Sequence, residues 1–384
     1  MDLKEIRTEI DSIDKELIKL FTKRMECSKQ VALYKKENNT PVLNVKREQE
    51  ILDKVEKEGG EYGYAAQLLF SNIMELSRGL QHDIIGSGKK IRSLIENSKG
   101  DLDKTQGVKI ALQGVKGANS HEAATQLFPD GTPVFYKSFS QVFEAVNNGE
   151  AKYGVLPVEN SSAGSVADVY DLILKYRFYI VKALNLPIQH CLCAIKQSQL
   201  SDIEQVWSHP QALAQCTDFT TAHNFTTVPS PNTAIAAQDI AKEKRLNCAA
   251  ICTKKAAREY GLKVLVEGCQ NNKDNSTRFI VISKELIIPE DADKISLCFS
   301  LPHITGSLYN VLGRFSSNGM NLTKLESRPR DGRAFEYLFY LDFHVLDFFF
   351  FNNSRPVILH NDLQFWFVQC FLLKTPDMIF WLEF

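Results

Sequence analysis

The first 37 residues carry a hydrophobic pattern that only a long helix can satisfy. From residue 2 to about residue 37, apolar side chains recur at spacings of three and four, which places them on one face of an α-helix. They are Ile6, Ile10, Ile13, Leu17, Leu20 and Phe21. Such a helix is about 35 residues long, longer than an ordinary globular helix, and Asn38-Asn39-Thr40-Pro41 ends it. Because shorter helices at about 44–57 and 64–81 bury little against it, we expect the long helix to pair with a second subunit.

Beyond a polar stretch at 91–106, which indicates a linker, the hydrophobic period changes. Short apolar runs typical of strands lie at 108–113, 133–137, 153–158, 178–184, 188–194, 248–252, 263–266 and 278–283. Helical patterns lie between most of them, at 119–128, 139–148, 165–176, 209–223, 232–243 and 253–260. This alternation predicts an α/β domain over 107–285 with mainly parallel sheets.

The last part of the chain begins as a small α+β unit and then changes composition. Over 292–344 the order is strand, helix, strand, strand, with a turn at Arg330-Asp331-Gly332, which is the first two-thirds of a ferredoxin-like unit. Residues 345–384 instead hold nine of the 24 Phe and two of the three Trp, with only six charged residues and no helical period. We favour a failure of the reading frame near His344 over the alternative of an unusual hydrophobic tail.

The overall composition excludes several classes of protein. A chain of 384 residues is long enough for about two or three domains. Lys plus Arg total 45 against 46 for Asp plus Glu, without a basic block, so nucleic-acid binding is not expected. The charged N-terminus has no apolar signal core, and no apolar run approaches the roughly 20 residues that span a membrane. Nine cysteines without a C-x-x-C pair suit reduced thiols rather than a disulfide or zinc framework. We therefore predict a cytoplasmic protein with no metal and no cofactor.

Basic residues on the long helix are spaced so that they can meet an anion. Arg24 and Lys35 are 11 residues apart, so on a helix they lie within about 20° of one face and about 16 Å from each other. Two long side chains could therefore converge on one small dianion. Arg7 lies 17 residues before Arg24, about 25 Å along the helix and about 100° around it, so only an antiparallel partner helix could bring it to the same place. Taken singly, such residues are more often a solvated helix face.

About the first 85 residues, which include these basic positions, resemble the all-helical chorismate mutase family. We place such a domain at 1–90. The matching site positions are Arg7, Arg24, Lys35, Asn44, Arg47, Glu48, Ser77 and Gln81, with Asn44 departing from the Asp of many relatives. The resemblance implies the pericyclic rearrangement of chorismate to prephenate, in which cations hold two carboxylates and a donor meets charge growing on the ether oxygen. It implies that Lys35 and Gln81 face that oxygen. It also implies that Arg24, Arg47 and Arg7 of the partner subunit hold carboxylates.

Four motifs along the α/β segment carry a second resemblance. They are G-V-K-G-A-N-S-H-E-A-A at 114–124, G-V-L-P-V-E-N-S-S-A-G-S-V at 154–166, S-H-P-Q-A-L-A-Q-C at 208–216 and N-S-T-R-F at 275–279. The stretch from about 107 to 285 is similar to prephenate dehydratase, which implies a two-lobed α/β fold like that of periplasmic binding proteins, with the site in the cleft. The implied reaction removes carbon dioxide and water from prephenate and leaves phenylpyruvate.

The resemblance also assigns roles within these motifs. Thr277 is the implied donor to the departing ring hydroxyl, and we expect hydrogen-bond donation, not proton release, because a Thr hydroxyl is a very weak acid. Arg278 beside it is predicted to clamp a carboxylate. Residues predicted to orient the substrate are Glu159, Asn160, Ser208 and Gln215. In an alternative interpretation Glu159 only fixes its loop.

Two short motifs near the end resemble the phenylalanine-sensing motifs of ACT domains. They are T-G-S-L-Y at 305–309 and L-E-S-R-P at 325–329, and the first departs from the commoner Ala-Leu-Val at 307–309. The predicted regulatory residues are Gly306, Ser307, Leu308, Glu326, Ser327, Arg328 and Pro329. Phenylalanine would bind at an interface between two such domains and bias a two-state equilibrium.

Together these resemblances predict a homodimeric, bifunctional chorismate mutase and prephenate dehydratase with a C-terminal ACT domain. One alternative is a mutase fused to prephenate dehydrogenase, but Gly114-Val115-Lys116-Gly117 lacks the G-x-G-x-x-G spacing of a dinucleotide site. The other alternative is a non-catalytic amino-acid sensor. The presence of Thr277 and of the complete helical set argues against it.

Overall fold

The computed structural model describes residues 2–86, 89–98, 100–289, 292, 294–301, 306–317, 320–329, 337–344 and 379–381. The chain forms two compact units. The first comprises residues 1–97, 302–319 and 349–376, and the second comprises 98–301, 320–348 and 377–384. Within the described ranges no helix is long and apolar enough to cross a membrane.

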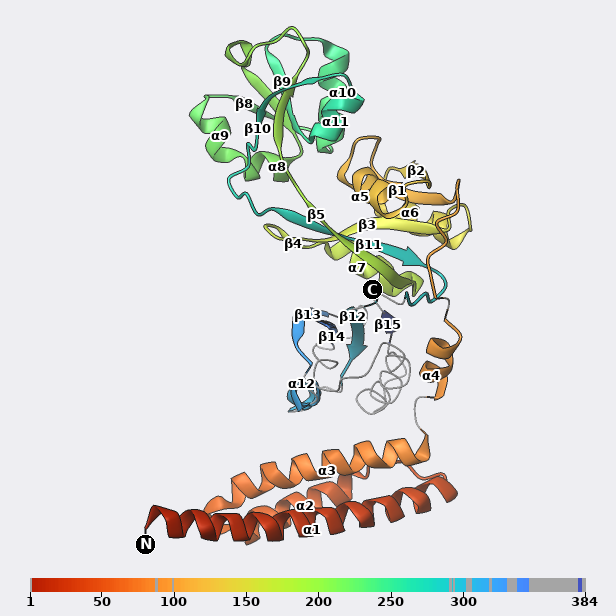
Figure 1. The fold of residues 1–384 in the computed structure, drawn as a ribbon, viewed down its shortest axis with the longest axis vertical. Coiled ribbons are helices and arrows are strands. Elements are labelled where there is room, and N and C mark those ends of the chain that lie inside the picture. Colours follow the sequence, from red (N-terminus) through yellow and green to blue (C-terminus); the bar gives the residue numbers. More distant parts are fainter. Residues whose placement is uncertain are drawn as a thin grey trace. The chain divides into compact units, whose positions relative to one another are not determined.

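Three helices form the N-terminal part of the first unit (Figure 1). They are α1 (Leu3–Glu37), α2 (Val45–Glu58) and α3 (Gly63–Ile85), and they lie where the hydrophobic pattern predicts them. A single 3-10 turn, η1 (Gly60–Tyr62), precedes α3. Helix α1 ends at the predicted break, where Asn39 takes a left-handed conformation with φ 49°. A short helix, α4 (Lys89–Glu96), follows at the start of the predicted linker.

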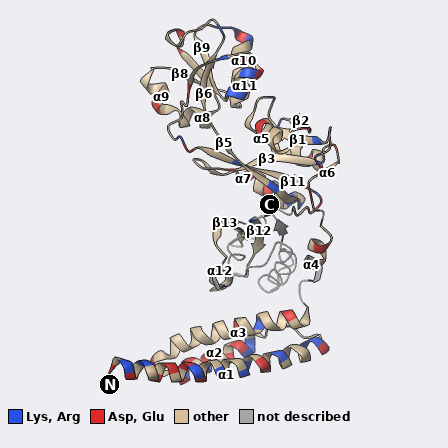
Figure 2. Cartoon of the chain, viewed as in Figure 1, with Lys and Arg blue, Asp and Glu red and all other residues tan. Residues whose placement is uncertain are grey.

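Helix α1 packs against α3 but leaves much of its apolar face uncovered. Its buried residues are Ser28 and Ala32. By contrast, Ile13, Leu17 and Leu20 are 53%, 52% and 61% exposed. Figure 2 shows Lys, Arg, Asp and Glu mixed along the rest of this helix. A contiguous exposed apolar face of this kind is typical of an interaction surface, as expected if a second subunit covers it.

The second unit contains two α/β lobes. The first lobe has a sheet in the order β2-β1-β3-β11-β5, with β4 beside β3. Its strands are β1 (Lys109–Gln113), β2 (Thr132–Tyr136), β3 (Tyr153–Asn160), β4 (Gly164–Ser165), β5 (Tyr179–Pro187) and β11 (Ser276–Ser283). Its helices are α5 (Asn119–Leu127), α6 (Phe139–Asn147) and α7 (Ala167–Tyr176). Two buried clusters form its core, one around Phe143 and Ile173 and the other around Tyr153 and Phe279.

The second lobe has a sheet in the order β10-β6-β9-β7-β8. Its strands are β6 (Cys191–Ala194), β7 (Gln205–Ser208), β8 (Thr226–Pro229), β9 (Cys248–Cys252) and β10 (Lys263–Glu267). Its helical segments are η2 (Leu200–Asp202), α8 (Pro210–Gln215), α9 (Thr217–Ala222), α10 (Thr233–Glu243) and α11 (Lys254–Glu259). The single helix predicted at 209–223 is thus broken at Cys216. The short strands β7 and β8 were not predicted.

The two-lobed α/β arrangement is confirmed, but the sheets are mixed and not mainly parallel. Strand β1 is parallel to β2 and β3, whereas β11 is antiparallel to both β3 and β5. In the second lobe β7 is parallel to β8 and β9, whereas β6 is antiparallel to β9 and β10. The cause is that the chain crosses between the lobes twice. It leaves along β5 into β6 and returns from β10 into β11, so the outgoing and returning strands run in opposite directions.

A third sheet lies near the end of the chain, in the order β13-β14-β12-β15. Its strands are β12 (Lys294–Ser300), β13 (Leu322–Pro329), β14 (Tyr337–His344) and β15 (Ile379–Trp381). Helix α12 (Ser307–Ser317) follows Gly306, which has φ 82°. The predicted strand, helix, strand, strand order is present, while the ACT assignment stays a prediction. Thr305 and the turn at 330–332 lie outside the described residues, and so does the predicted aberrant tail except for β15, which pairs with β12.

Candidate functional sites

Polar side chains of α1 and α3 form a hydrogen-bonded group at the predicted mutase site. Lys35 Nζ donates to Gln81 Oε1 at 2.9 Å and also to the carbonyl oxygen of Val42. Gln81 Nε2 donates to Ser77 Oγ at 3.2 Å, and the hydroxyl oxygens of Ser77 and Ser28 lie 2.6 Å apart. The structure therefore brings three of the predicted site residues together from two helices.

Arg24 lies one helical turn before Ser28 on the same face of α1, and its carbonyl oxygen accepts a hydrogen bond from Ser28 Oγ at 3.1 Å. Its Nη1 is buried without a hydrogen-bond partner among the described residues. A buried guanidinium nitrogen without an acceptor is costly, and a bound carboxylate would offset that cost. Burial also lowers the pKa of Lys35, although the negative charge of Glu48 opposes this. The group thus offers both cations and neutral donors.

Three other residues predicted for the mutase site lie at the start of α2. Glu48 forms an ion pair with Arg78 of α3, a residue that the sequence analysis did not select. Arg47 is 67% exposed and lies 3.3 Å from Glu50. Asn44 caps α2, because its Oδ1 accepts from the backbone nitrogen of Arg47 at 3.1 Å. This cap gives Asn44 a structural role in addition to the predicted contact with substrate.

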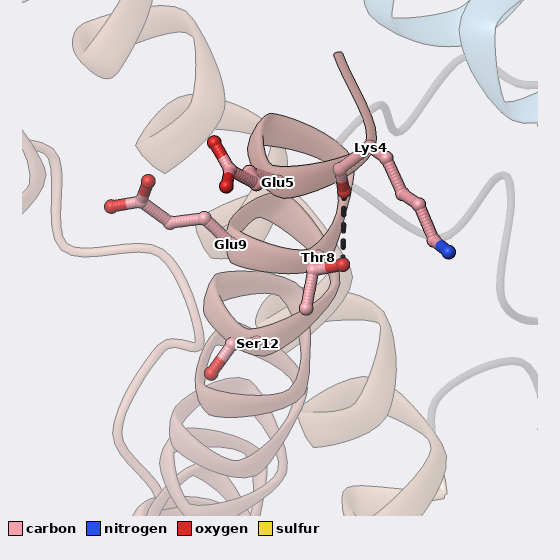
Figure 3. A pocket seen from close by; sticks show the side chains of 5 residues that line it. All are labelled: Lys4, Glu5, Thr8, Glu9 and Ser12. Atoms are coloured by element: carbon pink, nitrogen blue, oxygen red, sulfur yellow. Dashed lines mark hydrogen bonds between the residues drawn. The ribbon is translucent and has the colours of Figure 1, made fainter. Parts of the chain in front are cut away.

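The first turns of α1 carry an open groove (Figure 3). The groove is lined by Lys4, Glu5, Thr8, Glu9 and Ser12, all on α1. Figure 3 shows that Lys4 points away from Glu5 and Glu9, and Thr8 Oγ1 donates to the carbonyl oxygen of Lys4 at 2.9 Å. Because these side chains do not converge, the groove is not a candidate site. Arg7 is exposed, and its role in a partner subunit stays a prediction.

In the second unit, five polar side chains form a hydrogen-bonded chain that joins the two lobes. Asn160, at the end of β3, donates through Nδ2 to Thr277 Oγ1 at 3.0 Å and to Asn275 Oδ1 at 2.8 Å. Gln215, at the end of α8, donates through Nε2 to Asn160 Oδ1 at 3.5 Å and accepts from Asn275 Nδ2 at 3.1 Å. His190 Nε2 lies 2.9 Å from Gln215 Oε1. Three predicted site residues, Asn160, Gln215 and Thr277, are therefore brought together.

The hydroxyl of Thr277 is placed to donate. Thr277 is 8% exposed, and the register of β11 with β3 sets it opposite Asn160. Its oxygen accepts the Asn160 amide, so that bond leaves the hydroxyl proton unused, and the described residues provide no acceptor for it. A buried neutral donor of this kind can stabilise an oxygen that gains negative charge.

His190 is a member of this group that the sequence analysis missed. Burial lowers the pKa of His190, although its hydrogen bond to Gln215 opposes the shift, so the ring is neutral at pH 7. Its Nδ1 is buried and has no partner within the described ranges. The neutral ring fixes the Gln215 amide, and the Thr277 group as a whole consists of uncharged side chains.

Arg278 and Glu159 lie on the opposite face of the sheet from Thr277 and Asn160. Successive side chains of a strand alternate between faces, and Arg278 pairs with Glu159 directly beside the Thr277–Asn160 pair. Arg278 Nη1 lies 2.6 Å from Asp342 Oδ2 and 3.8 Å from Glu159 Oε2. The guanidinium is therefore paired on the reverse side of the strand from Thr277, and the predicted carboxylate clamp stays a prediction. Glu159 fits the alternative in which it fixes its loop.

Ser208 is also engaged structurally. Its Oγ donates to the carbonyl oxygen of Ile251 at 2.6 Å, and the residue is completely buried. The bond ties the end of β7 to the neighbouring strand β9. Among the described residues Ser208 makes no hydrogen bond to the Thr277 group, so its predicted contact with substrate stays a prediction.

The predicted regulatory residues fall in two segments. In β13, Glu326 and Arg328 share one half-buried face, with Arg328 Nε 3.0 Å from Glu326 Oε1. Ser327 and Pro329 lie on the exposed face of the same strand. The second segment, at the start of α12, holds Gly306, Ser307 and Leu308. Their role in binding phenylalanine stays a prediction.

Comparisons with known proteins match both halves of this description. The family model of chorismate mutase type II matches residues 6–82, and that of prephenate dehydratase matches 110–286. The bifunctional chorismate mutase/prephenate dehydratase of Buchnera aphidicola subsp. Schizaphis graminum is 30% identical over 348 residues, which cover 89% of this chain and 88% of that protein. Arogenate dehydratase/prephenate dehydratase 1 of Arabidopsis thaliana is 37% identical over 265 residues, which cover 65% of this chain and 67% of that protein.

A solved structure resembles the second part of the chain. The prephenate dehydratase of Arthrobacter aurescens, in complex with L-Phe, is 30% identical with a TM-score of 0.60, and the match covers 71% of this chain and 88% of that one. The chain spans about two thirds of the length of the plant arogenate dehydratases that it matches.

These findings define a bifunctional enzyme with an isomerase site on helices and a lyase site in an α/β unit. The chain belongs to the bifunctional chorismate mutase/prephenate dehydratase family, whose two reactions serve phenylalanine biosynthesis. The predicted family and the predicted enzyme classes are confirmed. Because the dehydratase model matches 110–286, neither a fused dehydrogenase nor a non-catalytic sensor is supported.

Proposed function

We propose that the helical site rearranges chorismate to prephenate with Lys35 and Gln81 as donors to the ether oxygen. Negative charge grows on that oxygen as its bond to carbon breaks. The bond from Lys35 to Gln81 Oε1 supports this role, since it turns the amide nitrogen of Gln81 away from Lys35. That nitrogen has two N–H groups, and Ser77 uses one of them. The second is available to the substrate at any pH, because an amide does not titrate.

Cations of the same site hold the substrate. We assign its two carboxylates to Arg24, Arg47 and Arg7 of the partner subunit. The buried, unpartnered Nη1 of Arg24 supports the first assignment. The exposed apolar face of α1 supports a homodimer. A homodimer is needed if Arg7 is to reach the site of the partner subunit.

The α/β unit then converts prephenate to phenylpyruvate, with Thr277 as the donor to the departing hydroxyl. The ring carboxylate leaves as carbon dioxide, its electron pair completes the aromatic ring, and the hydroxyl departs with a solvent proton as water. The single observation that carries this assignment is the hydrogen bond from Asn160 to Thr277, which leaves the Thr277 proton directed at another acceptor. Asn160 and Gln215 orient the substrate with their amides.

Regulation by phenylalanine belongs to the same proposal. The segments 306–308 and 326–329 would bind the amino acid as parts of an ACT domain, and the solved relative from Arthrobacter aurescens is a complex with L-Phe. We also propose that the protein acts in the cytoplasm.

The test supplies the purified chain with chorismate and follows prephenate and phenylpyruvate by chromatography. We expect prephenate to rise and then fall as phenylpyruvate accumulates. Because plant relatives are named arogenate dehydratases, arogenate is supplied in a parallel reaction. Faster turnover of arogenate than of prephenate would overturn the substrate assignment, and no prephenate from chorismate would overturn the mutase assignment.

A further inference from the structure

The hairpin that carries Asn160 has its own anchor. Asn160 ends β3, and after a three-residue turn the chain returns as β4, in which Ser165 pairs with Glu159. Asn160 Oδ1 accepts from two backbone nitrogens of that turn, both at 3.0 Å. A movement of the hairpin therefore moves the amide that contacts Thr277.

Ser165 is bonded to two side chains of β13. Its Oγ donates to Glu326 Oε2 at 2.5 Å and accepts from Lys324 Nζ at 2.9 Å. Lys324 Nζ also lies 3.3 Å from Glu159 Oε2, on the other strand of the hairpin, and donates to the hydroxyl of Tyr170 at 2.7 Å. The Lys324 side chain is only 9% exposed. Both strands of the hairpin are thus held by the Lys324 and Glu326 pair.

Glu326 is fully occupied by these contacts. Its Oε1 receives Arg328 Nε at 3.0 Å, while its Oε2 receives Ser165 and lies 3.5 Å from Lys324 Nζ. Burial alone would raise the pKa of Glu326, but the Ser165 hydroxyl and the charges of Lys324 and Arg328 lower it, so the carboxylate is ionised at neutral pH. An ammonium group that binds Glu326 must displace one of its three described partners. Ser165 is the one displaced, because it is neutral whereas Lys324 and Arg328 are attracted to the carboxylate by their charge.

A separate contact holds β11 itself. On the reverse face from Thr277, Arg278 Nη1 lies 2.6 Å from Asp342 Oδ2 of β14, whose side chain is 6% exposed. The same carboxylate accepts from Ser296 Oγ at 2.6 Å and lies 3.4 Å from Lys294 Nζ. None of these four residues contacts Glu326 through a described bond. Release of Ser165 would therefore remove the bond from β4 to Glu326, while β11 stays anchored and the turn keeps the bond from Ser161 N to the Ser276 carbonyl oxygen at 2.9 Å.

We propose that Ser165 couples the 326–329 segment to the dehydratase site. An amino acid whose ammonium binds Glu326 releases Ser165, and strand β4 of the hairpin that presents Asn160 to Thr277 loses its bond to Glu326. Ser165 is then a positioning residue that acts through Asn160. The inference rests on the proposed phenylalanine site, and it names the contact by which that site reaches the reaction. Couplings between sites typically change an affinity by about 5- to 150-fold.

The experiment measures dehydration of prephenate with and without phenylalanine, and phenylalanine binding by calorimetry, in four proteins. They are the wild type, Ser165→Ala, Ser165→Thr and the control Ser162→Ala, whose hydroxyl makes no described contact with β13. Phenylalanine is expected to slow the wild type, Ser165→Thr and Ser162→Ala by about fivefold or more. In Ser165→Ala the hydroxyl that bonds β4 to β13 is absent from the start, so the rate without phenylalanine is already lowered toward that of the inhibited wild type, and phenylalanine slows it by less than about a further twofold. Its binding is equal or tighter, because the competing hydroxyl is gone.

Tighter binding together with lost inhibition is a result that simple damage to the fold would not give. Inhibition of Ser165→Ala to the wild-type extent would overturn the coupling. So would a wild type that binds phenylalanine without a change in rate. A wild type that does not bind phenylalanine at all would overturn the regulatory site itself, and calorimetry separates this failure from the other two.

Discussion

The two sites of this chain meet their charged substrates in opposite ways. The helical site gathers Arg24 and Lys35 with the neutral donor Gln81. Among the described residues, the side chains hydrogen-bonded around Thr277 are uncharged, while the ion pair of Arg278 with Asp342 lies on the reverse face of the sheet. The first reaction keeps both carboxylates and benefits from cations that hold them close. The second expels a carboxylate as neutral carbon dioxide, which a cation bound to that group would oppose. The contrast teaches that a cation is useful at a carboxylate that the reaction keeps and not at the ring carboxylate that leaves as carbon dioxide.

The largest expected effect is at Thr277. Thr277→Ala should lower the rate of prephenate dehydration by about 10²- to 10⁴-fold, since loss of a positioned donor removes stabilisation of the leaving hydroxyl. Mutase activity should be unchanged. Ser283→Ala, at the other end of β11, is the matched control and should behave as the wild type. Steady-state assays of both reactions check this, and dehydration that survives in Thr277→Ala would remove Thr277 from the chemistry.

The reciprocal change is at Lys35. Lys35→Met should lower chorismate rearrangement by about 10²- to 10³-fold because a preorganised donor to the ether oxygen is lost, and it should leave dehydration intact. Lys36→Met is the control, since the exposed Lys36 donates to the carbonyl oxygen of Ile84 at 2.9 Å and, within the described ranges, makes no hydrogen bond to the site residues. Equal losses in the two variants would show that charge on this part of α1, not the position of Lys35, is what matters.

A change in pH dependence should follow from Gln81→Glu. A carboxyl group can donate to the ether oxygen only while protonated, and its ordinary pKa is about 4.3. Mutase activity of the variant should therefore fall as the pH rises through the pKa of the new side chain, which moves the optimum to acid pH. The dehydratase profile should not move. An unchanged mutase profile would count against Gln81 as the donor.

The smallest effect concerns His190. Its pKa is lowered in the folded protein, so the unfolded chain gains a proton near pH 6.5 while the folded ring stays neutral to lower pH. The stability from the neutral ring is complete above pH 6.5 and is lost as the pH falls below it. His190→Asn should cost about 1 kcal/mol at pH 8, from the lost bond to Gln215.

Thermal unfolding of the wild type and His190→Asn at several pH values measures this difference. The difference in melting temperature between the two proteins should become smaller as the pH falls from 8 to 5. Comparison of the two proteins cancels the contributions of His121 and His209, whose pKa values are also lowered by burial. A difference in melting temperature that does not depend on pH would mean that His190 stabilises the Thr277 group by packing alone.

The helical site was the easier one to predict, because spacing on a helix fixes which residues share a face. Arg24 and Lys35 follow from their separation, and Ser28 could have been found in the same way, four residues after Arg24 and seven before Lys35. Arg78 offered no such signal, since its pairing with Glu48 depends on how α3 packs.

The α/β site was predicted less well because its residues come from strand ends of both lobes. Thr277 and Arg278 are neighbours in sequence, yet strand alternation sends them to opposite faces. Asp342, which pairs with Arg278, lies 64 residues further on, and no local pattern indicates it. His190 is a lone histidine whose partner, Gln215, lies 25 residues further on at the end of α8. The mixed sheets escaped prediction for the same reason, because the two crossings between lobes leave no mark on the hydrophobic period.

The claim that the chain holds two independent sites is tested most directly by mixing two variants, each of which is inactive at one of the two sites. Thr277→Ala alone should turn chorismate into prephenate and stop there, and Lys35→Met alone should leave chorismate nearly untouched. Each is purified separately, and equal amounts are combined with chorismate. The account predicts that the mixture forms phenylpyruvate, because prephenate released by one variant is dehydrated by the other. A mixture that accumulates prephenate without phenylpyruvate, although Lys35→Met dehydrates added prephenate, would contradict it.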